Sequence, residues 1–127
     1  MANPNIVNVS TIYGNTSSYL ISSTADPFAT ALINNLASSG KIFKINSIIV
    51  ANVDGTSAAD VTIKLFSQDD LGGTGTALVS TVSVPADSTL IVVDKSTAIY
   101  LLEDKSIGAT ASAANDLVVT CSWEEIN

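Results

Sequence analysis

The sequence predicts an all-β protein, and three observations lead to this prediction. Hydrophobic residues make up 46% of the 127 positions and charged residues only 13%, which is about half of the usual charged share. Serine and threonine fill about a quarter of the positions, and such a composition suits half-buried strands better than surface helices. Segments with strand character also recur at roughly 8–12-residue spacing, as expected of a β-sandwich or a barrel.

The expected strands follow one another along the chain and are separated by turn-forming residues. Each strand shows alternating apolar and polar positions or a short apolar run. Clusters such as 54–57 and 85–88 combine Asp or Pro with small residues and favour turns. We expect strands at 6–13, 19–21, 42–53, 61–65, 78–84, 90–93, 99–102, 107–111 and 117–124.

The length fits one domain, 1–127, in which residues 1–38 form an arm and strands that the pattern defines least well. Gly14 and Asn15 are expected to form a turn between the first two strands. For residues 27–38 the sequence leaves two structures open. Pro27 at a first helical position, with apolar residues at helical spacing after it, fits a short helix. Because the segment is poor in strong helix formers, a strand followed by a turn is the preferred prediction.

The last predicted strand has the clearest alternation. Leu117, Val119, Cys121 and Trp123 occupy alternate positions, so all four are expected to face the core. Cys121 is then a small buried apolar residue and not a nucleophile. It is the only cysteine, and therefore no intrachain disulfide can form within this sequence.

The charge of the chain argues against nucleic-acid partners, and the shortness of its apolar runs argues against a membrane span. The formal net charge is −7, with five lysines and no arginine, whereas nucleic-acid binders neutralise phosphates with Lys and Arg. Lys41 and Lys44 are close in sequence, and we expect both at solvent-facing strand positions. No apolar run is long enough to span a bilayer. The first residues lack the features of a signal peptide, so synthesis in a cytoplasm is expected.

The sequence offers little equipment for catalysis or metal binding. It contains no histidine, which removes Ser-His-Asp and Cys-His catalysis and His-containing zinc sites. The glycine-rich segment 71–75 lacks the Gly-Lys-Ser/Thr ending of a phosphate-binding loop. The adjacent acids at 69–70 lie in a predicted loop, and those at 124–125 point to opposite faces of a strand. We therefore expect no catalytic, cofactor-binding or metal-binding residues.

Calcium is the least improbable cofactor among those considered. The candidate ligands are Asp54, Asp60, Asp69 and Asp70, which lie in or beside predicted loops. Their spacing does not match the loop of an EF-hand. We therefore expect no bound calcium.

Five segments give the chain a resemblance to small virion structural proteins of tailed bacteriophages, of the type found in phages of marine cyanobacteria. The segments are 39–52 (SGKIFKINSIIVAN), 59–66 (ADVTIKLF), 84–90 (VPADSTL), 104–112 (DKSIGATAS) and the closing strand 117–126 (LVVTCSWEEI).

The resemblance covers roughly residues 39–126, and residues 15–38 depart from it. It implies a single antiparallel β-sandwich of about eight or nine strands, similar to a jelly roll. It also implies a virion location, after assembly in the cytoplasm of a bacterial host, as capsid decoration or as a collar or tail part.

The leading hypothesis is a non-enzymatic capsid decoration (cement) protein that stabilises the shell. Its partners would be the major capsid protein or other virion proteins. Self-association is also expected, with a trimer preferred, because open sheet edges invite pairing. One alternative is a collar, tail or fibre component of the virion. Another is a carbohydrate- or receptor-binding β-sandwich in which Tyr13, Tyr19, Tyr100 or Trp123 stacks on sugars.

Overall fold

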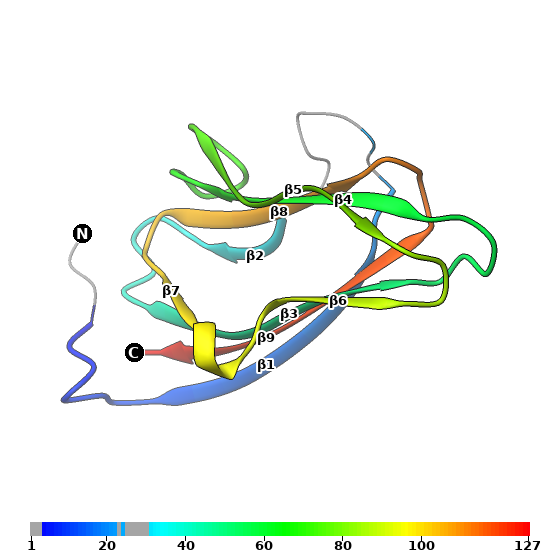
Figure 1. Cartoon of the computed structure of the whole chain (residues 1–127). Helices are drawn as coiled ribbons and strands as arrows, with labels where there is room; N and C mark the ends of the chain where they lie inside the picture. Colours follow the sequence, from blue (N-terminus) through cyan, green and yellow to red (C-terminus); the bar gives the residue numbers. More distant parts are fainter. Residues whose placement is uncertain (1–3, 23, 25–30) are drawn as a thin grey trace.

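The computed structural model describes residues 4–22, 24 and 31–127. In this part of the chain nine strands form two antiparallel sheets that pack against each other (Figure 1), so the predicted all-β sandwich is confirmed. The strands are β1 (Ile12–Leu20), β2 (Ala31–Asn35), β3 (Ile42–Asn52), β4 (Ala59–Phe66), β5 (Gly75–Val84), β6 (Thr89–Val93), β7 (Ile99–Leu101), β8 (Lys105–Ala111) and β9 (Leu117–Ile126), and a 3-10 helix, η1 (Lys95–Thr97), separates β6 from β7.

The strand order is that of a jelly roll. The first sheet has the order β1-β9-β3-β6 and the second the order β2-β8-β4-β5. The short strand β7 pairs with residues 43–45 of β3, while β6 pairs with residues 48–51 of the same strand. The strands β6 and β7 therefore act as one strand that η1 interrupts. Eight strand positions remain, shared by two four-stranded sheets as in a jelly roll, which confirms the jelly-roll-like architecture that the resemblance implies.

A capping box at Asp94 fixes the interruption between β6 and β7. One oxygen of its carboxylate accepts hydrogen bonds from the hydroxyl of Ser96 (2.6 Å) and from the backbone N–H groups of Ser96 (2.9 Å) and Thr97 (3.1 Å). The hydroxyl of Thr97 in turn accepts from the backbone N–H of Asp94 at 3.0 Å. The hydrogen bonds from Ser96, and more weakly those from Thr97, lower the pKa of Asp94 below its ordinary value.

Alternating side chains of both sheets fill the space between them. Each apolar side chain that moves from water to this core stabilises the fold by about 1.5–3 kcal/mol. The fully buried members include Ile45, Ile48, Val50, Val61, Ile63, Leu101, Ile107, Leu117, Val119 and Cys121. Three of the four residues predicted to point inward from the last strand are thus confirmed. Trp123 shares their face but is only partly buried, because it lies at the open side of the sandwich.

A buried asparagine joins the two sheets at one end of the sandwich. Asn52, the last residue of β3, is only 3% exposed. Its Nδ2 donates to the backbone oxygens of Val84 (2.8 Å) in the opposite sheet and of Ser57 (2.9 Å), and its Oδ1 accepts from the N–H of Asp54 at 2.9 Å. Every polar atom of this side chain therefore has a partner, as burial requires.

The predicted boundaries of the first strands are wrong. Residues 6–8 form a turn, in which Asn5 accepts from the N–H of Val7 (2.9 Å) and of Asn8 (3.1 Å). The strand β1 starts only at Ile12, and the predicted turn at Gly14 and Asn15 lies inside it. The preference of Gly14 and Asn15 for a turn is overridden here, because β1 pairs with β9 without interruption along its whole length.

The strand-plus-turn prediction for residues 27–38 is confirmed where the structure describes them. Residues 31–35 form β2, which pairs with β8, and a turn follows at 37–38. The alternative prediction, a short helix, is therefore wrong for residues 31–36. Pro27 and the rest of the proposed first helical turn lie outside the described residues.

Candidate functional site

The four aspartates considered for calcium do not come together. The carboxylate of Asp54 accepts from the N–H and the hydroxyl of Thr56, both at 3.0 Å. In the loop after β4, Asp69 accepts from the N–H of Ala37 (2.9 Å), and Asp70 bonds to Asn34. Within the described ranges, no three His, Cys, Asp or Glu side chains are placed to hold one metal ion. The acids at 69–70 instead hold their loop against β2 and the turn that follows it.

The two adjacent glutamates on β9 point to different sides of their sheet. Glu124 accepts from Nδ2 of Asn46 (3.2 Å) and lines a shallow depression of about 420 Å³ on the outer side. Glu125 lines the pocket between the sheets and forms an ion pair with Lys41. The expectation that these carboxylates face apart is confirmed, and they form no acid–base pair.

Cys121 has the properties of a core residue. Its side chain is fully buried, and burial raises the pKa of its thiol to about 12. The thiol therefore stays protonated at neutral pH, and the reactive thiolate is absent. The interpretation of Cys121 as a small buried apolar residue is confirmed.

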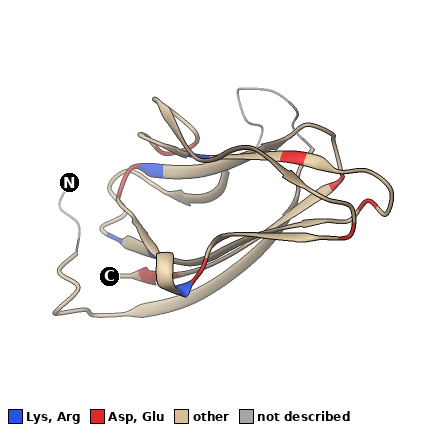
Figure 2. Ribbon diagram, viewed as in Figure 1, with Lys and Arg blue, Asp and Glu red and all other residues tan. Residues whose placement is uncertain are grey.

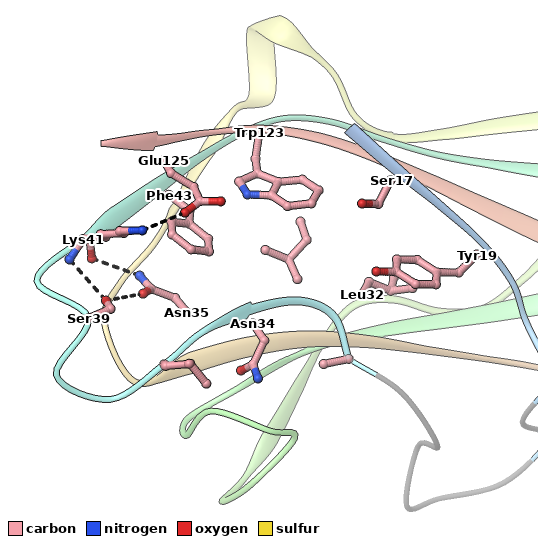
Figure 3. Close-up of a pocket in the computed structure, with 13 residues that line it drawn as sticks. Ser17, Tyr19, Leu32, Asn34, Asn35, Ser39, Lys41, Phe43, Trp123 and Glu125 are labelled. Atoms are coloured by element: carbon pink, nitrogen blue, oxygen red, sulfur yellow. Dashed lines mark hydrogen bonds and ion pairs between the residues drawn. The ribbon is translucent and has the colours of Figure 1, made fainter. Parts of the chain in front are cut away.

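A pocket of about 340 Å³ lies between the two sheets at the open side of the sandwich, and both sheets contribute to its walls. It lies between β1 and β9 of the first sheet and β2 of the second (Figure 3). Tyr19 of β1 and Trp123 of β9 line it, with Phe43 and Leu32 contributing buried apolar surface. Two of the four aromatic residues proposed for sugar stacking are thus brought into one cavity.

Polar residues line the same pocket. Nζ of Lys41 lies 3.2 Å from Oε1 of Glu125, and Oε2 of Glu125 accepts from Nδ2 of Asn15 at 2.8 Å. Asn35 is fully buried and donates to the backbone oxygens of Lys41 (3.0 Å) and Leu101 (3.1 Å). Its Oδ1 accepts from the hydroxyl of Ser39 at 2.6 Å. These contacts hold the ion pair and the β2–β3 turn in place (Figure 3).

Three other residues singled out in the sequence, Tyr13, Tyr100 and Lys44, lie outside this pocket. Tyr13 and Tyr100 are both exposed and do not line this pocket. Lys44 lines the outer depression as a half-exposed strand residue.

The prediction for Lys41 is wrong in one respect, since it precedes β3 and its side chain pairs with Glu125. Ser17 was missed because only the pairing of β1 with β9 places it in the pocket.

The charged side chains are unevenly distributed. The turns at 53–58, 85–88 and 112–116 lie at one end of the sandwich and carry Asp54, Asp87 and Asp116 without a lysine (Figure 2). This end is therefore acidic and would repel polyanions.

The described residues include no helix of sufficient length and apolarity to cross a membrane.

Comparison with known proteins supports the fold. No family model and no curated protein sequence matches the chain. A solved structure, described as "Bacillus endospore appendages form a novel family of disulfide-linked pili", matches it with a TM-score of 0.52 and 18% sequence identity. The match covers 100% of this chain and 94% of that chain. At this level of identity the likeness concerns the fold alone. It is a likeness to a pilus protein, so the resemblance to phage proteins stays a hypothesis.

Proposed function

We propose that this protein is a non-enzymatic structural subunit that acts in many copies, as a decoration protein on a phage capsid. The observation that carries the proposal is the outer edge of the first sheet, at β1. This strand is nine residues long, contains no charged residue and no proline, and keeps continuous register with β9. Such an edge exposes unpaired backbone groups that another strand can satisfy.

The other edges of the two sheets are less suited to pairing. The strand β5 has two register shifts against β4, and Thr81 within it has a positive φ of 49°. The strand β2 has five residues and one register shift, and β6 is five residues long and ends at the capped turn before η1. Bulges and short length are the usual means of protecting an edge. The strand β1 lacks both, and we infer that it meets another subunit.

The outer face of the first sheet supports a role in docking. One row of side chains crosses β1, β9, β3 and β6 through Ser18, Thr120, Ile49 and Ile91. The neighbouring rows, through Thr16–Ser122–Ser47 and Leu20–Val118–Ala51–Thr89, are also uncharged. A broad uncharged face suits contact with a shell of capsid protein. Many weak contacts of this kind would reinforce the shell through avidity.

Self-association is tested by placing charge on the exposed edge. We expect the purified protein to be an oligomer by multi-angle light scattering and the variant Thr16→Lys/Ser18→Lys to be a monomer, because charged side chains on an edge oppose strand pairing. The matched variant is Thr76→Lys/Ser80→Lys on β5, where both residues are also exposed.

The two variants together distinguish the modes of assembly. Pairing of two β1 edges is isologous and closes a dimer, in which case only the β1 variant dissociates. Pairing of β1 with β5 is heterologous. It gives a ring such as the expected trimer where the rotation between subunits closes, and a filament where it does not; in either case both variants dissociate. A folded β1 variant that keeps the oligomeric state of the unmodified protein would contradict the role of β1.

The virion assignment is tested by counting copies in purified particles of a phage whose genome encodes this protein. A decoration protein should be present in hundreds of copies, while a collar or tail part should occur in rings of about six or twelve. Quantitative mass spectrometry against the major capsid protein gives this ratio. Absence of the chain from the particles would refute both positions.

The fold match favours a second candidate, a subunit of an extracellular filament. The matching structure is described as a disulfide-linked pilus. Cys121, the only cysteine of this sequence, is fully buried, so it is not placed to form a disulfide between subunits of a filament. Electron microscopy of the concentrated protein would show filaments in that case.

A further inference from the structure

We propose that the pocket between β1 and β2 binds one or two neutral sugar rings of a glycan. The cavity of about 340 Å³ lies within the size range of small-molecule sites, which is roughly 300–1,000 Å³. Its walls come from both sheets, and Figure 3 shows Ser17 and Trp123 of the first sheet facing β2 of the second. The inference does not depend on how the chain assembles, because one copy supplies all these residues.

The aromatic residues of the pocket suit the apolar faces of a sugar. Tyr19 is 37% exposed, so its ring is accessible from solvent. Trp123 is partly buried and packs on the core behind it. Aromatic rings of this kind provide a flat apolar surface and a polar tip at little cost in side-chain entropy. A sugar ring presents C–H groups to such a surface and hydroxyl groups to its surroundings.

Polar groups in the pocket are available for those hydroxyl groups. Within the described residues the hydroxyls of Ser17 and Tyr19 have no hydrogen-bond partner. Nε1 of Trp123 also has no partner, but this atom is buried, so the indole is expected to offer a sugar its ring and not its N–H. These groups lie on β1 and β9 and line one side of the cavity.

The charges of the pocket favour a neutral ligand. Lys41 and Glu125 contribute one charge of each sign and form an ion pair at 3.2 Å. The carboxylate is oriented further by Asn15 at 2.8 Å. A pocket without net charge gives no advantage to a phosphate or to an ammonium group. A wholly apolar ligand would leave the two free hydroxyls desolvated and unpaired, which is unfavourable.

The experiment uses Trp123, the only tryptophan, as a reporter in the pocket. Glucose, galactose, mannose, N-acetylglucosamine, cellobiose and lactose are titrated against the full chain, and emission is followed together with isothermal calorimetry. We expect at least one of them to change the emission with a saturable, millimolar Kd. Tyr19→Ala should weaken that binding about tenfold, since it removes the stacking surface.

Two variants separate stacking from hydrogen bonding and from general effects. Tyr19→Phe keeps the ring and loses the hydroxyl, so its loss of affinity should be smaller than that of Tyr19→Ala. Tyr100→Ala, at an exposed tyrosine of β7 outside the pocket, should bind as the unmodified protein does. Circular dichroism checks that each variant is folded. Absence of a response to every sugar well above millimolar concentration would overturn the proposal, as would equal losses for Tyr19→Ala and Tyr100→Ala.

Discussion

Replacement of Ile63 by alanine is expected to reduce the free energy of unfolding by about 2–5 kcal/mol. Ile63 is fully buried on β4, between β5 and β8, and belongs to the main core cluster. The change removes apolar contacts and leaves a cavity that rigid neighbouring strands cannot fill completely. Since a domain of this size has a total stability of about 5–15 kcal/mol, the loss is a large fraction. Urea unfolding followed by far-ultraviolet circular dichroism measures it.

The matched control is Ile91→Ala. Ile91 is also an isoleucine in a strand, but it is 62% exposed on the outer face of the first sheet. Its replacement should change the free energy of unfolding by less than about 1 kcal/mol. Equal losses at the two positions would contradict the assignment of the core to the space between the sheets.

Replacement of Asn52 by aspartate is the second change with a large expected effect. The two side chains have the same shape, but a carboxylate would place negative charge against the backbone oxygens of Val84 and Ser57, to which Asn52 now donates. A buried charge without a partner reduces stability by roughly 3–5 kcal/mol. We expect that loss at neutral pH, measured by urea unfolding.

The loss caused by Asn52→Asp should depend on pH. Burial raises the folded-state pKa of such a carboxyl group above its unfolded value. The folded state then binds the proton more tightly, so stability falls as pH rises through the folded pKa and recovers as pH is lowered. Asn115→Asp, at an exposed turn position with φ of 68°, should show almost no loss. A loss for Asn52→Asp that is independent of pH would point to a packing defect instead.

Much of the fold could be predicted because its signals are local. Residues 42–126 alternate or form short apolar runs, and the strands from β3 to β9 lie close to the predicted positions. Leu117, Val119 and Cys121 face the core as their period of two requires. The sequence also predicts β6 and β7 as two separate short strands. It does not predict the capping box at Asp94, which interrupts this jelly-roll strand between them.

The N-terminal strands show the limit of local signals. The six residues of β1 from Gly14 to Tyr19 are a glycine, four polar residues and a tyrosine, so they show no apolar strand pattern. Turn preference at Gly14 and Asn15 therefore outweighed strand preference in the sequence. In the folded chain the backbone of β1 is held by β9, so its side chains need not pack in the core.

The sequence by itself determined the fold class, the inward face of the later strands and the inert character of Cys121, because each follows from side-chain period and composition. Only the tertiary structure decided where β1 lies and which residues meet in the pocket. Asn15 contacts Glu125 across 110 positions of sequence, and Tyr19 joins Trp123 because β1 and β9 are paired. Contacts of that range depend on how whole strands are arranged, and a local pattern carries no information about them.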